Sequence, residues 1–254
     1  RDIKKYPYPV QTVPADARIR EAIRVFDLIN SQGTPLTQAD IVLAYMTAEW
    51  PDIRREFKDK IEELKQRNFS FDLTFMTRCM VGIVCGVGRL ESYTDVGEKR
   101  LQQGWKQLKK ALNYIVTFLR HKACIVDDDD LNTANVLVPL VVHIARNGWF
   151  TQDNENRFLY WLYAALFKRR YSGSVETVLD QDIKALLDDP DLDLLIGNLK
   201  EDEGDPVVSP SNLDMRWVGH PLYNIVKTVL RANDAEDWVT GLPLVETGSG
   251  DFSI

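Results

Sequence analysis

The sequence predicts an all-α protein, a multi-helix bundle of about eight to ten helices with short extended segments at both ends. Apolar residues recur at the 3.6-residue period of a helix along most of the chain, and residues that start and stop helices separate these stretches. The 254 residues are 44% hydrophobic and 27% charged, as in a soluble globular protein with its own core. No apolar run approaches the ~18 residues that a membrane span requires.

The first predicted helix begins at Asp16, after the short alternating segment YPYPVQTV, and stops at Gly33, which can take the left-handed conformation that ends a helix. Thr37 is the expected N-cap of the next helix, with Asp40 three residues later in the capping-box position. That helix runs to about Trp50. The polar turn between the two helices, INSQGTP, is predicted to be a rigid elbow.

The same signals predict the remaining helices. Pro51 suits the first turn of a third helix, and Asp72 can cap a fourth. A long helix is expected over residues 95–120, and another starts or bends near Pro139. The last three are predicted from the segments ENRFLYWLYAALFKRR, SVETVLDQDIKALL and HPLYNIVKTVLRA. The first of these is apolar nearly all round, which is typical of a central helix.

The helical domain is therefore expected to span residues 15–238, with residues 121–131 as the candidate boundary between two sub-bundles. The acidic segment LKEDEGDPVVSPSN is rich in helix breakers, which predicts a loop before the last helix. Residues 1–14 and 239–254 lack the helical period and are predicted to be turns and short extended pieces.

The net charge of −7 conceals two parts of opposite sign. Residues 1–170 carry 26 Lys and Arg against 21 Asp and Glu, a balance of +5, whereas residues 171–254 carry 5 against 17, a balance of −12. Overall acidity disfavours a dedicated non-specific DNA-binding protein, which is usually basic. A local basic patch on the first part stays open, as does an acidic part that meets another basic domain.

Two clusters are candidate DNA or phosphate contacts, because Arg, Lys, Ser and backbone N–H groups are common phosphate ligands. The first, at the end of a buried helix, comprises Lys168, Arg169, Arg170, Tyr171, Ser172 and Ser174. The second, on the long helix, comprises Lys106, Lys109 and Lys110, extended by Arg100, Arg120 and Lys122. The structural alternative for the first is that its cations offset a helix dipole and Ser174 caps the next helix; for the second it is a solvated charged face.

The segment HKACIVDDDD offers His121, Cys124 and four aspartates as a metal cluster, but a solvated acidic run that favours a helix start is the expectation. His143 lies on an apolar helix and is predicted to be a satisfied core histidine. Cys79 and Cys85 do not share a helix face, which disfavours a zinc site or a redox pair. No catalytic residue and no metal site are therefore expected here. Buried free thiols predict a reducing, cytoplasmic compartment.

Five segments resemble one known family, in the same order along the chain. They are VFDLINSQGTPLTQADIVLA, TAEWPDIRREF, FSFDLTFMTRCM, RRYSGSVETVLDQDIKAL and EDWVTGLPL. Together they are similar to the region that follows the ParB-like nucleotide-binding domain in GmrSD-type restriction endonucleases. That family acts against DNA with modified bases and joins a ParB-like N-terminal domain to a C-terminal HNH nuclease.

The resemblance implies that this chain is the helical, DNA-contacting middle region of such an enzyme. Residues 1–14 would leave the ParB-like domain and residues 239–254 would lead into the HNH domain. The family's Asp-Gly-Gln-Gln-Arg motif does not occur in these residues. Its HNH histidines are absent too, since the only histidines are the widely separated His121, His143 and His220. No cofactor is then expected in these residues; nucleotide and a divalent metal would belong to the missing domains. The implied partners are DNA, bound weakly, and those two domains, with no membrane.

The resemblance also places the elbow at a domain junction. The junction loop is then Asn30, Ser31, Gly33 and Thr34, of which Asn30, Ser31 and Thr34 would touch nucleotide or relay its state. The alternative to a restriction-enzyme region is a non-catalytic helical scaffold or protein-interaction module that keeps the family's body and has lost its chemistry.

Overall fold

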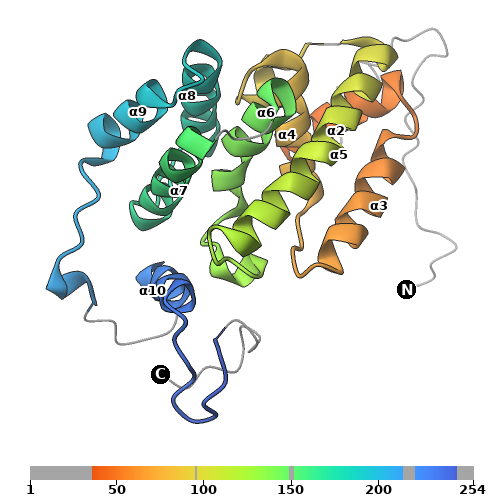
Figure 1. Ribbon diagram of the computed structural model, residues 1–254. Helices are drawn as coiled ribbons and strands as arrows, with labels where there is room; N and C mark the ends of the chain where they lie inside the picture. The colour runs from red at the N-terminus through yellow and green to blue at the C-terminus, as the bar shows by residue number, and fades with distance from the viewer. Residues whose placement is uncertain (1–35, 95, 149–151, 214–220, 245–254) are drawn as a thin grey trace, which may run out of the picture.

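Nine α-helices account for most of the chain that the computed structural model describes, which is residues 36–94, 96–148, 152–213 and 221–244 (Figure 1). The only β-pairing in these ranges is an isolated antiparallel bridge between Glu236 and Pro243. The predicted all-α fold is therefore confirmed. The predicted helix from Asp16 to Gly33 and the junction loop, with Asn30, Ser31 and Thr34, lie outside the described residues.

Local capping fixes where the first helices begin, as the sequence predicts. Helix α2 (Gln38–Glu49) starts with a capping box, in which Thr37 Oγ1 accepts from the Asp40 backbone N–H at 3.2 Å and Asp40 Oδ2 accepts from the Thr37 N–H at 3.1 Å. Helix α3 (Ile53–Lys65) is the exception, because Pro51 lies in the turn before it, not in its first turn, and its N-cap Asp52 makes no side-chain capping hydrogen bond. Asp72 caps α4 (Leu73–Cys85) by accepting the Phe75 N–H at 2.7 Å. Each cap satisfies an N–H group that the helix itself leaves without a partner.

Helix α4 lies at the centre of the first group of helices and packs against α2, α5 (Gly97–His121) and α6 (Leu137–Asn147). Two glycines allow this close approach. A Cβ atom on Gly104 of α5 would lie 2.6 Å from Val84 Cγ1 of α4, and one on Gly82 of α4 would lie 2.4 Å from Val142 Cγ2 of α6. Both distances are far inside van der Waals contact, so the spacing of α4, α5 and α6 depends on these two positions.

Helices α7 (Gln152–Phe167), α8 (Val175–Asp188) and α9 (Asp193–Glu203) lie beside the first group, and α10 (Pro221–Ala232) packs on α7 below them (Figure 1). Helix α6 joins the two groups, because it packs on α8 as well as on α4 and α5. Buried apolar side chains from α2 to α9 form one continuous cluster. The expected boundary at residues 121–131 therefore does not separate two cores in the described part of the chain.

Helix α9 corrects the predicted loop, because Leu199–Glu203 form its last turns. Leu195 and Leu199, one turn apart, are fully buried, and Asp189 Oδ2 accepts from the Leu194 N–H at 2.8 Å near the start of the helix. The loop was predicted from the acidic composition of the segment, which is dominated by the exposed side of α9 and not by these two buried leucines. The non-helical segment begins only at Gly204, whose φ of 74° ends the helix. None of the described helices is both long and apolar enough to cross a membrane.

Candidate nucleic-acid interface

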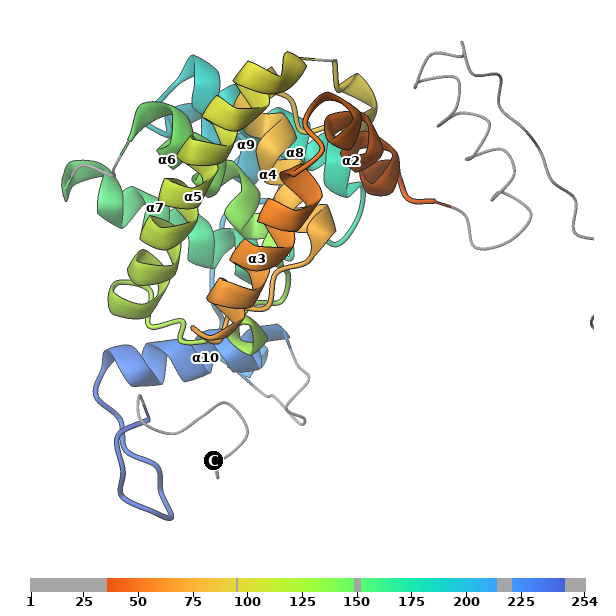
Figure 2. The same cartoon turned by 90° about the vertical axis from the view of Figure 1, so that its right-hand side faces the viewer.

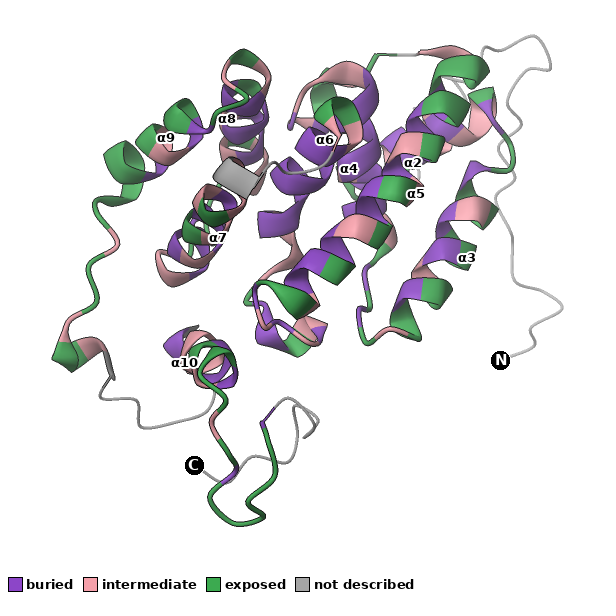
Figure 3. Cartoon of the chain, viewed as in Figure 1, coloured by how far each residue is buried: buried purple, intermediate pink, exposed green. Residues whose placement is uncertain are grey.

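The long helix α5 carries a strong excess of positive charge. Its 25 residues include six Lys or Arg and a single acid, Glu98. Leu101, Trp105 and Leu108 turn one side of the helix into the core, and the opposite side is exposed along much of its length (Figure 3). This amphipathic arrangement follows from the spacing of the apolar residues and leaves the cations at the surface.

Three lysines of α5 share its outward side, at positions seven and four residues apart, and are called here the basic ridge: Lys99, Lys106 and Lys110. All three are exposed, and none has an ion-pair partner among the described residues. The first and last of them are eleven positions apart, which is about 16 Å along the helix, or roughly five base pairs of duplex DNA at 3.4 Å each. The ridge is therefore a linear, uncompensated array of positive charge on the scale of a few phosphates.

A cleft of about 540 Å³ lies beside the ridge, between α5 and the ends of α4 and α6. It is lined by Ile83, Val84, Lys99, Arg100, Gln103, Gly104, Gln107 and Arg146. A second cleft of about 270 Å³ continues it past Gln107 and is lined by Gln107, Lys110, Ala111, Ile144, Ala145 and Gly148. The two together are called the α5–α6 groove. Four cations and two glutamines line the groove, and no carboxylate does.

Two arginines of the groove are held in place by the C-terminal end of α4. Arg100 donates to the Val84 carbonyl, and Arg146 Nη1 lies 3.3 Å from the Ile83 carbonyl and 3.5 Å from that of Gly82. Cations at this end of a helix interact favourably with its dipole. A guanidinium has five N–H donors, so these bonds leave others of each arginine for a ligand in the cleft. The two side chains are thus fixed before any anion arrives.

Sequence reasoning identified only part of this interface. Lys106 and Lys110 lie on the basic ridge as the predicted strip requires, but Lys109 turns toward α3. Its Nζ lies 3.9 Å from Glu56 Oε2 and 5.2 Å from the centroid of the Trp105 ring. Lys99 and Arg146 were not among the predicted contacts. They line the same cleft because α5 and α6 lie side by side, which spacing along one helix does not reveal.

The predicted phosphate contacts Arg170 and Tyr171 are wrong, because both side chains are buried in an ion-pair network. Arg170 donates to both carboxylate oxygens of Asp182, from Nε at 2.9 Å and from Nη2 at 2.6 Å. The Tyr171 hydroxyl donates to Asp182 Oδ2 at 2.5 Å. Arg170 Nη1 reaches Asp202 of α9 at 3.2 Å. These groups connect α7, α8 and α9 inside the protein and have no surface to offer DNA.

The other residues of that cluster are separate from the groove. Lys168 is half-buried and donates to the Glu203 carbonyl at 2.7 Å, which ties the end of α7 to α9. Arg169, Ser172 and Ser174 are exposed. Ser174 precedes α8 but makes no side-chain capping hydrogen bond. The structural alternative is therefore wrong for Ser174, and the contacts of Lys168 and Arg170 with Glu203 and Asp182 go beyond the offset of a helix dipole.

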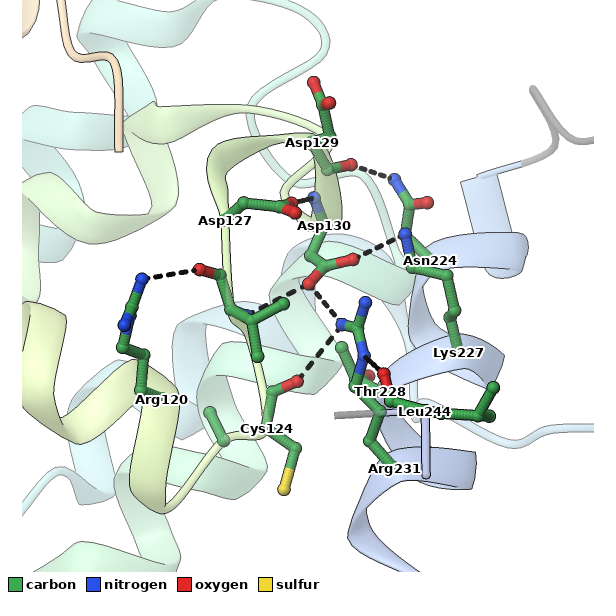
Figure 4. Close-up of polar contacts among 12 residues, drawn as sticks. Arg120, Cys124, Asp127, Asp129, Asp130, Asn224, Lys227, Thr228, Arg231 and Leu244 are labelled. Atoms are coloured by element: carbon green, nitrogen blue, oxygen red, sulfur yellow. Dashed lines mark hydrogen bonds and ion pairs between the residues drawn. The ribbon is translucent and has the colours of Figure 1, made fainter. Parts of the chain in front are cut away.

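The acidic run in HKACIVDDDD is not the solvated surface that the sequence predicts, since two of its aspartates are buried. Asp130 accepts from the Val126 N–H at 3.0 Å and from the guanidinium of Arg231, and its Oδ1 forms an ion pair with Lys227 Nζ at 2.7 Å (Figure 4). Asp127 Oδ1 accepts from the Asp130 N–H at 3.1 Å. The run therefore anchors α10 to the body. The signal that could have found it is the pair of cations, Lys227 and Arg231, which lie four residues apart and therefore on one face of α10.

No group of three or more His, Cys, Asp or Glu side chains in the described ranges is arranged to hold a metal ion. His143 is a core histidine as predicted: burial lowers its pKa to about 4, its Nδ1 lies 3.1 Å from Asn147 Nδ2, and its ring packs on Phe158. Cys79 is a buried free thiol, whereas Cys85 and Cys124 are free but only half-buried. Burial raises the pKa of the Cys79 thiol.

Comparison of the chain with models of protein families, with curated proteins and with solved structures finds no match. The geometry of the α5–α6 groove is therefore the basis on which a function is proposed.

Proposed function

We propose that this chain is a non-catalytic helical region that holds the DNA backbone in the α5–α6 groove. It would do so as the connecting part of a modification-dependent restriction endonuclease of the GmrSD type. The observation that carries the proposal is a groove lined by four cations and no carboxylate. Two of these cations, Lys99 and Lys110, also belong to the basic ridge, whose lysines have no ion-pair partner among the described residues. Cations gathered in this way repel one another, and a bound anion relieves that repulsion.

Phosphate oxygens would be bound by the basic ridge along its length and by Arg100 and Arg146 inside the cleft. Neutralising phosphates releases counterions, which makes this binding strong at low salt and weak at high salt. Backbone contacts of this kind position DNA but do not read its sequence. Recognition of a modified base, and cleavage, would therefore belong to other parts of the enzyme, and the proposal assigns no bond-breaking step to these residues.

The first prediction concerns the basic ridge. Replacing Lys99, Lys106 and Lys110 together with Ala should weaken binding to a short DNA duplex by roughly tenfold, because up to three phosphate contacts are lost. The slope of log K against log salt concentration should fall by roughly 0.9 for each contact removed. Fluorescence anisotropy of a labelled duplex, titrated at several salt concentrations, measures both quantities. Plain and base-modified duplexes should bind equally.

The matched control removes the same charge from another helix. Arg54, Lys58 and Lys65 are exposed on α3, where acidic residues lie between them. Their replacement with Ala should change the DNA affinity and its salt slope far less than the ridge substitutions do. If both variants lost the same DNA affinity, the loss would follow from the change in net charge and not from the position of the lysines, which would contradict the proposed site. Undetectable binding of the unaltered chain at low salt would contradict the proposed function itself.

A further inference from the structure

A short turn after α10 presents three large apolar side chains to solvent. Trp238 is 91% exposed, Val239 72% and Leu242 50%. These residues lie in the segment 236–243, called here the Trp238 turn, which projects from the body beyond α10 (Figure 2). Trp is the residue most enriched at the energetic centres of protein interfaces, and a fully exposed one contributes little to the fold.

The backbone of the Trp238 turn is fixed by its own hydrogen bonds. Glu236 and Pro243 form the antiparallel bridge that closes it. Inside, the buried carboxylate of Asp237 accepts from the Val239 N–H at 3.1 Å and from the Thr240 N–H at 2.7 Å and hydroxyl at 2.8 Å. The Asp237 N–H donates to the Leu242 carbonyl at 2.8 Å. Trp238 is thus held on a preorganised support, which reduces the entropy lost on binding.

The charge around the turn decides what kind of surface it can meet. Residues 232–244 contain three acids, Asp234, Glu236 and Asp237, and no Lys or Arg. Nucleic acid and anionic membrane surfaces would repel this segment. Its complement is a protein surface that combines an apolar recess with a basic rim.

The α5–α6 groove of the same chain has this composition. Its smaller part, about 270 Å³, is lined by the apolar residues Ala111, Ile144 and Ala145, with Lys110 at its rim. Lys99, Arg100 and Arg146 lie in the adjoining cleft. The charge balances of the two parts of the chain, +5 for residues 1–170 and −12 for residues 171–254, have the same complementarity on a larger scale.

We propose that the Trp238 turn of one copy docks in the α5–α6 groove of a second copy. Trp238 would fill the apolar recess, and Asp234 and Glu236 would face the groove's cations. The contact is head-to-tail, so a bound pair leaves one free turn and one free groove, from which rings or open chains follow. Because the turn and the DNA backbone would use the same groove, self-association and DNA binding would exclude each other. This regulation rests on the proposed function, whereas the self-association does not.

Sedimentation velocity of the 254-residue chain, at protein concentrations up to about 0.5 mM in low salt, tests the proposal. The unaltered chain should self-associate, and short duplex DNA or high salt should reverse this. Trp238→Ala should weaken the association by roughly 30-fold or more, as expected for an interface hot spot, without lowering the affinity for DNA. The control Val207→Ala removes another apolar side chain in an acidic segment, 73% exposed, and should have no effect.

A mixing experiment identifies the two halves of the contact. Trp238→Ala keeps an intact groove, and Lys99→Glu/Lys110→Glu keeps an intact turn, so neither should self-associate but an equimolar mixture should form a 1:1 complex. A monomeric unaltered chain would overturn the proposal, as would a Trp238→Ala variant that associates normally or a mixture that stays monomeric. The DNA affinity of the Trp238→Ala variant, measured separately, shows whether the proposed function stands when this inference fails.

Discussion

Arg170→Ala should lower the free energy of unfolding by about 3–5 kcal/mol, because it leaves the carboxylate of Asp182 buried without its counter-charge. Both side chains are fully buried. Burial alone would lower the pKa of Arg170, but its hydrogen bonds to Asp182 and the charge of that carboxylate raise it above the ordinary value, so the guanidinium stays protonated. Urea unfolding followed by circular dichroism measures the loss.

The neighbouring substitution Arg169→Ala is the control, since Arg169 is exposed and should change stability by no more than about 0.5 kcal/mol. The double variant Arg170→Met/Asp182→Leu should recover much of the lost stability, because it removes both charges and replaces them with apolar groups. If Arg170→Ala were as stable as Arg169→Ala, the network that joins α7, α8 and α9 would not hold them together as described.

Asp130→Ala should also cost about 3–5 kcal/mol, because two cations of α10, Lys227 and Arg231, would then be buried without their carboxylate. The two cations and Asp130 are almost wholly inaccessible to solvent. Helix α10 should separate from the body first, since its other packing is mainly on α7. Hydrogen exchange should show the amides of α10 losing protection well before those of α4.

Asp128→Ala provides the comparison for Asp130, because Asp128 lies in the same acidic run but is only half-buried. It should leave both the exchange of α10 and the unfolding midpoint nearly unchanged. Equal behaviour of the two variants would contradict the role of Asp130 as the anchor of α10.

The sequence predicted the helices well wherever the determinants are local. Thr37 with Asp40, and Asp72, are caps whose partners lie three residues away, so spacing alone identifies them. Helix α9 was missed because only two of its residues, Leu195 and Leu199, are buried in the core. Two apolar residues in an acidic segment are too few to show a helical period. The helix depends on tertiary packing more than on its own pattern.

The candidate site was less predictable, because burial of a charge depends on partners far along the chain. Arg170 looks like a surface cation at a helix end until Asp182 is placed against it. Asp130 looks solvated until Arg231, about a hundred residues later, is brought to it. The exposure of Lys106 and Lys110 could be predicted from helix spacing alone, because no acidic residue from elsewhere in the described structure forms an ion pair with them. The groove itself needed the contact of α5 with α6.

The most direct test of the proposal that DNA binds in the α5–α6 groove is lysine acylation of the unaltered chain, with and without duplex DNA, followed by mass spectrometry. Lys99, Lys106 and Lys110 should be protected by DNA at low salt and modified again when salt is raised, whereas Lys58 and Lys65 of α3 should react equally in both states. Protection that falls on α3, or on no lysine of α5 under conditions where DNA is bound, would contradict the account.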